Sequence, residues 1–89
     1  MSKSLFVGNI AYGAMEMEIR ELFSSYGTVQ NVRFAMDHRR GRFRGFGFVI
    51  MSDNDAEVAV QELDGTEFQG RRLKVSVARA SREASLQSA

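Results

Sequence analysis

The segment Arg44-Gly45-Phe46-Gly47-Phe48-Val49-Ile50-Met51 constrains the architecture of this protein most strongly. Successive side chains of a β-strand point to opposite faces, so a strand here places Phe46 and Phe48 on one face and Val49 on the other. Both faces are therefore apolar. At 89 residues the chain supports one domain with one modest core, too small to cover both faces of a sheet. One face is expected to need a partner.

The rest of the chain predicts three more strands and two helices, because short alternating apolar runs are separated by two segments of helical periodicity. Gly27 and Gly65 end the two helical segments. Strands are expected over 4–9, 29–36, 43–51 and 71–78, and helices over 15–26 and 53–63. The side chains expected to face the helices are Leu5, Val7, Val32, Phe34, Met36, Val49, Met51, Leu73, Val75 and Val77, while Arg33 and Ala35 are expected on the opposite face.

This order of elements, βαββαβ, predicts an α+β fold with a four-stranded antiparallel sheet and two helices packed on one face. The polar segment 37–42 reads as a hairpin loop between neighbouring strands. We expect the domain to span residues 1–79. Residues 80–89 are small and polar without an apolar stripe, and are expected to form a flexible tail.

Nothing remains in the sequence to cover the second face of that sheet. Alternation places Phe6, Phe46 and Phe48 there, beside cationic side chains. Three exposed phenylalanine rings on adjacent strands form an apolar patch that is costly in water unless a planar ligand binds it. The cations expected on this face are Arg33, Arg44 and Lys74.

Charge is distributed unevenly, although the net charge is only +1. Residues 33–44 hold five basic side chains and one acid, and residues 71–82 hold five basic side chains and no acid. Residues 15–26 and 53–64, which contain the two helical segments, hold eight acids and a single base, Arg20. The domain is thus expected to have a basic sheet side and an acidic helix side. Aromatic rings flanked by arginines suit single-stranded nucleic acid, whose bases stack while its phosphates meet the cations.

Ordinary packing explains some of the other aromatic residues. Phe23, Phe34 and Phe68 are interpreted as packing residues. Phe43 is left open between packing and ligand contact, and Tyr12 between a surface loop residue and a ligand contact. The hairpin arginines Arg39, Arg40 and Arg42 are interpreted as phosphate contacts, with a solvated loop tip as the alternative.

Two stretches of the chain closely resemble the motifs of the RNA recognition motif family. Arg44 to Met51 matches the family's octapeptide except that Met51 replaces its final aromatic residue, and the segment Leu5-Phe6-Val7-Gly8-Asn9-Ile10 matches its hexapeptide. The resemblance extends from about residue 4 to residue 79 and is closest to the small single-motif proteins of bacteria and organelles. It implies the ferredoxin-like version of the fold.

The resemblance also implies roles for single residues. Phe6 and Phe48 would stack on successive bases, Phe46 would pack against the sugars between them, and Arg44 would contact phosphate. The function implied is noncatalytic binding of single-stranded RNA, in post-transcriptional regulation or RNA chaperoning, with single-stranded DNA as a further ligand. The full set of expected polar and phosphate contacts is Arg33, Arg39, Arg40, Arg42, Arg44, Lys74, Ser76 and Arg79.

Several other functions are disfavoured. The chain has no cysteine and a single histidine, His38, so we expect no metal, no cofactor and no enzymatic activity. No signal-peptide core or membrane segment is apparent, and we expect a cytoplasmic monomer. The competing hypothesis is a protein-interaction module of the same fold, which would use its aromatic face or its acidic helix face.

Overall fold

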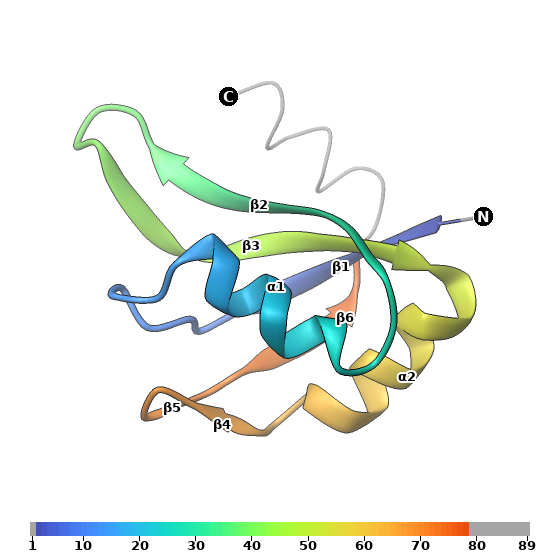
Figure 1. Cartoon of the computed structure of the whole chain (residues 1–89). Helices are drawn as coiled ribbons and strands as arrows, with labels where there is room; N and C mark the ends of the chain where they lie inside the picture. The colour runs from blue at the N-terminus through green and yellow to red at the C-terminus, as the bar shows by residue number, and fades with distance from the viewer. Residues whose placement is uncertain (1, 79–89) are drawn as a thin grey trace.

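The structure is a computed structural model that describes residues 2–78 (Figure 1). Its main sheet has four strands in the order β2-β3-β1-β6, and every neighbouring pair is antiparallel. The strands are β1 (Ser2–Gly8), β2 (Val29–Asp37), β3 (Arg42–Ser52) and β6 (Lys74–Val77). The predicted α+β fold is confirmed. The expected tail at 80–89 and the expected contact Arg79 lie outside the described residues.

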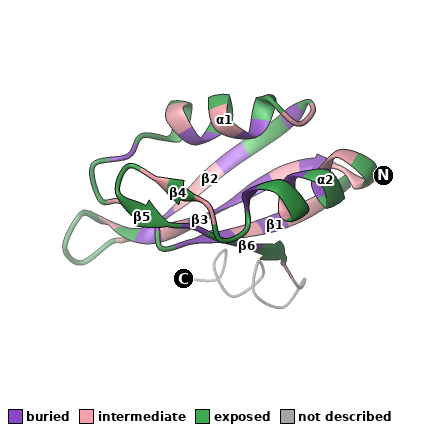
Figure 2. Ribbon diagram, turned by 90° about the horizontal axis from the view of Figure 1, so that it is seen from below, coloured by how far each residue is buried: buried purple, intermediate pink, exposed green. Residues whose placement is uncertain are grey.

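Both helices, α1 (Glu16–Ser24) and α2 (Asp53–Leu63), pack on the same face of this sheet (Figure 1). Their buried side chains include Ile19 and Phe23 from α1 and Leu63 from α2. Most of the buried residues, purple in Figure 2, belong to one apolar cluster between the helices and the sheet. Seven of the sheet residues predicted to face the helices are buried in that cluster, namely Leu5, Val7, Val32, Val49, Met51, Leu73 and Val75.

Side chains of α1 cover the outer edge of β2, which is an edge strand of the sheet. Glu16 Oε2 accepts a hydrogen bond from the Phe34 N–H at 3.0 Å, and Arg20 Nη1 donates one to the Val29 carbonyl at 3.1 Å. Unpaired backbone groups on an edge strand otherwise invite pairing with another chain. The first turn of α1 is also closed locally, since Glu18 Oε1 accepts from the Met15 N–H at 2.8 Å in place of the missing capping residue.

The pairing of β2 with β3 is irregular at two places. Gln30 is an extra residue of β2, because Val29 pairs with Met51 and Asn31 with the next residue, Ile50. Farther along, Phe34 pairs with Gly47 and Met36 with Phe43, so β3 spans four residues where β2 spans two. Strict alternation therefore fails on β2. Ala35 is fully buried and Met36 is 44% exposed, the reverse of the prediction.

The second irregularity depends on two glycines. Gly45 has φ 90°, which turns the backbone of β3, and its carbonyl accepts the Ile10 N–H at 2.8 Å. Gly47 lies where β2 approaches most closely. A Cβ atom there would be 2.5 Å from the Arg33 carbonyl oxygen and 3.1 Å from the Phe34 Cα. Only a residue without a side chain fits between the two strands at this point.

The last part of the chain differs from the single strand predicted over 71–78. A small hairpin precedes the final strand, with β4 (Glu67–Phe68) paired to β5 (Arg71–Arg72) through Gln69 and Gly70, which both have positive φ. Leu73 then leads into β6. Val77 is opposite Leu5 as alternation requires, but it is near the end of an edge strand and is 47% exposed, so its predicted burial is wrong.

The close approach at Gly47 predicts a stability cost for any side chain there. Gly47→Ala should lower the free energy of unfolding by about 1–3 kcal/mol, because backbone atoms must move to admit the methyl group. Urea unfolding followed by circular dichroism measures the change. Gly13→Ala is the control, since no atom lies within 4 Å of the position its Cβ would take. Equal effects of the two substitutions would contradict the packing argument.

Candidate functional site

Three phenylalanine rings gather on the face of the sheet that the helices leave uncovered. Phe6 comes from β1, and Phe46 and Phe48 come from the neighbouring strand β3; we call them the aromatic triad. Phe6 and Phe48 are direct cross-strand partners. The ring centroid of Phe6 is 5.6 Å from that of Phe46 and 6.0 Å from that of Phe48, and the Phe46 and Phe48 rings meet edge to face at 6.4 Å. The two sequence motifs thus converge on one cluster.

The three rings of the triad are unequally exposed, whereas the sequence had suggested that all three face solvent. Phe48 is only 3% exposed, so the expectation that its ring faces solvent is wrong. Phe6 and Phe46 are half-buried. Phe48 is in the middle of the sheet, between Phe6 on one neighbouring strand and Arg33 on the other, and directly paired residues carry side chains on the same face about 5 Å apart. Phe6 and Phe46 are the triad rings that reach the surface.

Cationic and polar side chains surround the triad as predicted from alternation. The Arg44 guanidinium carbon lies 5.3 Å from the centroid of the Phe46 ring, within cation–π range. Lys74 on β6 is exposed and lines the same depression as Phe6. Ser76 is the cross-strand partner of Phe6, and Arg33, half-buried, is that of Phe48. These four residues share the helix-free face with the triad.

The hairpin between β2 and β3 holds the other predicted arginines. Asp37 organises it, since its Oδ1 accepts from the backbone N–H groups of Arg39 at 3.0 Å and Arg40 at 3.4 Å. Arg39, Arg40 and Arg42 are all exposed. Arg40 and Arg42 line a depression of about 300 Å³ that connects the hairpin to the sheet; its other lining residues are Tyr12, Asp37, Phe43 and Arg44.

Charge separates between the two sides of the domain. Within residues 2–78 the single ion pair joins Lys3 and Glu57 at 3.1 Å, on the helix side of the sheet. The cations around the triad have no acidic partner in that part of the chain, so they remain available for an anionic ligand. The use of the acidic helix side for a protein partner stays a prediction.

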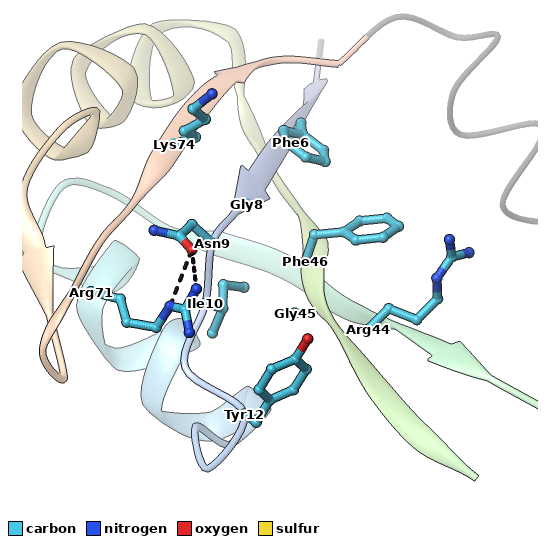
Figure 3. Close-up of a pocket in the computed structure, with 10 residues that line it drawn as sticks. All are labelled: Phe6, Gly8, Asn9, Ile10, Tyr12, Arg44, Gly45, Phe46, Arg71 and Lys74. Carbon is cyan, nitrogen blue, oxygen red and sulfur yellow. Dashed lines mark hydrogen bonds between the residues drawn. The ribbon is translucent and has the colours of Figure 1, made fainter. Parts of the chain in front are cut away.

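The structure settles Phe43, places Tyr12, which the sequence had left open, beside the triad, and adds Asn9 and Arg71, which the sequence had not assigned. The Phe43 ring stacks on Phe34 at 4.2 Å and packs against the core, so its role is packing. Asn9, Tyr12 and Arg71 line a depression of about 230 Å³ beside Phe6 and Phe46 (Figure 3). Asn9 belongs to the hexapeptide and Tyr12 follows it closely, so both were visible in the sequence, but Arg71 is brought there by the β4–β5 hairpin, which was not predicted.

Two findings concern other kinds of site. In the described part of the chain no three His, Asp or Glu side chains come together in a group that could hold a metal ion. Neither helix within residues 2–78 has the length and apolarity needed to cross a bilayer.

Comparison with known proteins identifies the family. The model of the RNA recognition motif matches residues 5–74 of the chain. This protein belongs to the RNA recognition motif family. The match spans both motifs and both helices, so the resemblance predicted from the two motifs is confirmed, and the family indicates a binding module and not an enzyme.

Relatives of this RNA recognition motif occur in bacteria and in plant organelles. One is "Putative RNA-binding protein RbpE" of Nostoc sp. (strain PCC 7120), 46% identical over 81 residues, which cover 90% of this chain and 82% of the relative. Another is "Glycine-rich RNA-binding protein 3, mitochondrial" of Arabidopsis thaliana, 44% identical over 86% of this chain and 25% of the relative. The predicted similarity to small bacterial and organellar proteins is thereby confirmed.

Solved structures of the same fold include one with RNA present. "RNA Binding Protein PG1" superposes with a TM-score of 0.81 at 43% identity, covering 85% of this chain and 93% of that one. "Rna15 RRM with bound RNA (GU)" superposes with a TM-score of 0.79 at 30% identity, covering 96% of this chain and 94% of that one. Fold and sequence similarity therefore agree.

The unequal burial of the triad predicts unequal effects on stability. Phe48→Ala should lower the free energy of unfolding by about 3–5 kcal/mol, because it leaves a cavity where a buried ring was packed. Phe46→Ala should cost clearly less, since its ring already meets water. Urea unfolding of both variants measures the difference, with Phe48→Leu as a milder substitution if Phe48→Ala fails to fold. A cost at Phe46 as large as that at Phe48 would contradict the observed burial.

Proposed function

We propose that this protein binds single-stranded RNA across the helix-free face of its sheet and has no catalytic activity of its own. The observation that carries the proposal is the pair of half-buried rings, Phe6 and Phe46, set on adjacent strands with Arg44 and Lys74 beside them. Sheet-borne aromatic residues of this family stack on two or three bases. The RNA-bound Rna15 structure, similar over nearly the whole chain, supports the same ligand class.

Base stacking and electrostatic attraction both contribute to the binding free energy. One base stacked on an aromatic side chain contributes about 1–3 kcal/mol, so Phe6 and Phe46 together supply about 2–6 kcal/mol. That range corresponds to modest affinity. Phosphate contacts from Arg44, Lys74 and the hairpin arginines add an electrostatic contribution that depends on salt.

The role we propose for Phe48 differs from the base stacking that the family resemblance implies. Its ring is covered in this structure, so direct stacking on Phe48 requires that it first be uncovered. As it stands, Phe48 supports the other two rings through edge contacts at 6.0 and 6.4 Å. Phe6 and Phe46 are therefore the first contacts for an incoming strand.

Stacking alone does not distinguish RNA from DNA, because it does not involve the 2′-hydroxyl group. Ser76 carries an exposed hydroxyl on the strand next to Phe6, and we propose that this hydroxyl hydrogen-bonds a ribose or a base edge. We propose RNA as the ligand, single-stranded DNA as a weaker one, and a cytoplasmic role in post-transcriptional regulation or RNA chaperoning.

Removing either accessible ring should weaken RNA binding. Phe6→Ala and Phe46→Ala are each expected to lose about 1–3 kcal/mol of binding free energy. Fluorescence anisotropy with a labelled oligouridylate measures Kd, and circular dichroism checks the fold. Met17→Ala is the control, because Met17 is 68% exposed on the helix side. Unchanged affinity of the Phe6→Ala, Phe46→Ala double variant would refute the proposed function.

RNA affinity should also fall as the salt concentration rises, and the steepness of that fall depends on the number of phosphate contacts. The slope of log Kobs against log salt is about −0.7 per contact for single strands, so Arg44→Gln should make the slope shallower by about that amount. Titrations at several salt concentrations measure it. Lys3→Gln removes the same charge from the helix side, where Lys3 already pairs with Glu57, and should leave the slope unchanged.

A further inference from the structure

We infer that the RNA site continues beyond the sheet, with a further base stacking on Tyr12 and its phosphate bound by Arg71. The inference rests on the proposed function and deepens it. The loop after β1 and the β4–β5 hairpin, far apart in sequence, meet at the end of the depression that begins at Phe6 and Phe46 (Figure 3). A strand leaving the two sheet rings in this direction meets an aromatic ring and a cation.

Tyr12 has the properties of a stacking platform. Its side chain is 70% exposed, the largest exposure among the bulky apolar and aromatic residues of the described chain. The ring is nonetheless held in place, with its edge against Phe43 at a centroid distance of 6.4 Å and its Cε1 close above Gly45. A ring that is both exposed and fixed loses little conformational entropy when a base binds.

Gly45 contributes to this placement as well as to the strand. Its carbonyl bonds the Ile10 N–H at 2.8 Å, which ties the loop carrying Tyr12 to β3. A Cβ atom on residue 45 would lie 3.7 Å from Tyr12 Cε1, in contact with the ring. The irregularity of β3 thus brings the loop and its aromatic ring next to Phe46.

Arg71 is oriented toward the same depression by Asn9. Asn9 Oδ1 accepts from Arg71 Nε at 3.1 Å and from Arg71 Nη2 at 2.6 Å, as the dashed lines of Figure 3 show. Two of the five guanidinium N–H groups are used in this way, and three remain for an anion. Because Asn9 is uncharged, it positions the cation without neutralising it.

Asn9 itself is placed for this role by its backbone. It has φ 59°, a left-handed conformation that asparagine tolerates better than most residues, and its Nδ2 donates to the Arg72 carbonyl at 2.8 Å. The side chain therefore bridges the end of β1 to both residues of β5. Asn9 is a positioning residue for Arg71.

The proposed subsite is continuous with the rest of the site. The depression beside Phe6 and Phe46 also includes Tyr12 and Arg71, and the depression of the hairpin arginines shares Tyr12 and Arg44 with it. Tyr12 thus stands between the sheet rings and the arginine hairpin. A strand that passes over Tyr12 keeps its phosphates within a basic surface on both sides.

The first experiment compares a short and a longer RNA. Tyr12→Ala should weaken binding of an oligouridylate hexanucleotide by about 5- to 150-fold, the loss expected for one stacked base, and leave a uridine dinucleotide unaffected. Tyr12→Phe should restore hexanucleotide binding. Unchanged hexanucleotide affinity in Tyr12→Ala, or an equal loss for both lengths, would overturn the inference.

A direct optical test uses the tyrosines of the chain, since it has two and no tryptophan. In a Tyr26→Phe variant Tyr12 is the only tyrosine, and a base stacked on it quenches its fluorescence. The hexanucleotide should quench this emission and the dinucleotide should not. The Tyr12→Phe variant, which retains only Tyr26, should show no quenching. Absence of quenching in the Tyr26→Phe variant at saturating hexanucleotide would overturn the inference.

Arg71 has a closely matched control on the same short strand. Arg71→Ala should make the salt slope for the hexanucleotide shallower by about 0.7, whereas Arg72→Ala, which removes the same charge from the other face of the hairpin, should not. Asn9→Ala should change the slope as Arg71→Ala does, and the double variant should change it no further. Equal changes of the slope in Arg71→Ala and Arg72→Ala would contradict these assignments. An unchanged slope in Asn9→Ala would contradict them as well.

The outcomes separate this inference from the proposed function. If Phe46→Ala binds both lengths of RNA as the unsubstituted protein does, the sheet site is wrong whatever Tyr12 does. If Phe46→Ala weakens both lengths and Tyr12→Ala changes neither, the sheet site stands and the extension is wrong.

Discussion

The helices of this protein cover one face of its sheet, and the rest of the structure depends on that one-sided packing. Two short helices bury their apolar residues against one layer of strand side chains, and that layer forms the single core. The opposite face is left with the same strands and the same alternation of side chains. Side chains on that face are in contact with either water or a ligand. Phenylalanine rings and unpaired cations there define a binding surface by position as well as by chemistry.

Glycine makes that surface possible where the strands are most crowded. Gly47 admits the backbone of β2, and Gly45 turns β3 so that two extra residues fit opposite β2. The turn has a second consequence, because the carbonyl of Gly45 holds the loop after β1. The same small residues that let β3 pair with its neighbours therefore bring Tyr12 next to the aromatic triad. The glycine-dependent irregularity of β3 therefore serves both the packing of the sheet and the proposed ligand site.

Electrostatic asymmetry complements the one-sided packing. A net charge of +1 hides a separation in which seven of the eleven acids are on the helices and most arginines are on the sheet face and its hairpins. Such a separation attracts and orients an anionic strand toward the sheet without a large net charge. Asn9, which is uncharged, accepts hydrogen bonds from the Arg71 guanidinium, and Asp37 accepts them from the backbone N–H groups of Arg39 and Arg40. Both residues position basic residues without an ion pair to a guanidinium group.

The amino-acid sequence was enough to predict the order of elements, the sheet face of most strand residues, the family and the two strands that carry the triad. Those properties follow from side-chain periodicity and two local motifs, which act within a few residues. Three features became evident only in the folded chain: Phe48 is covered, Ala35 and Met36 exchange their expected burial, and Arg71 lines the depression beside Phe6 and Phe46. Burial depends on side chains from neighbouring strands, and a shift of register or an unforeseen hairpin changes it without altering the local pattern.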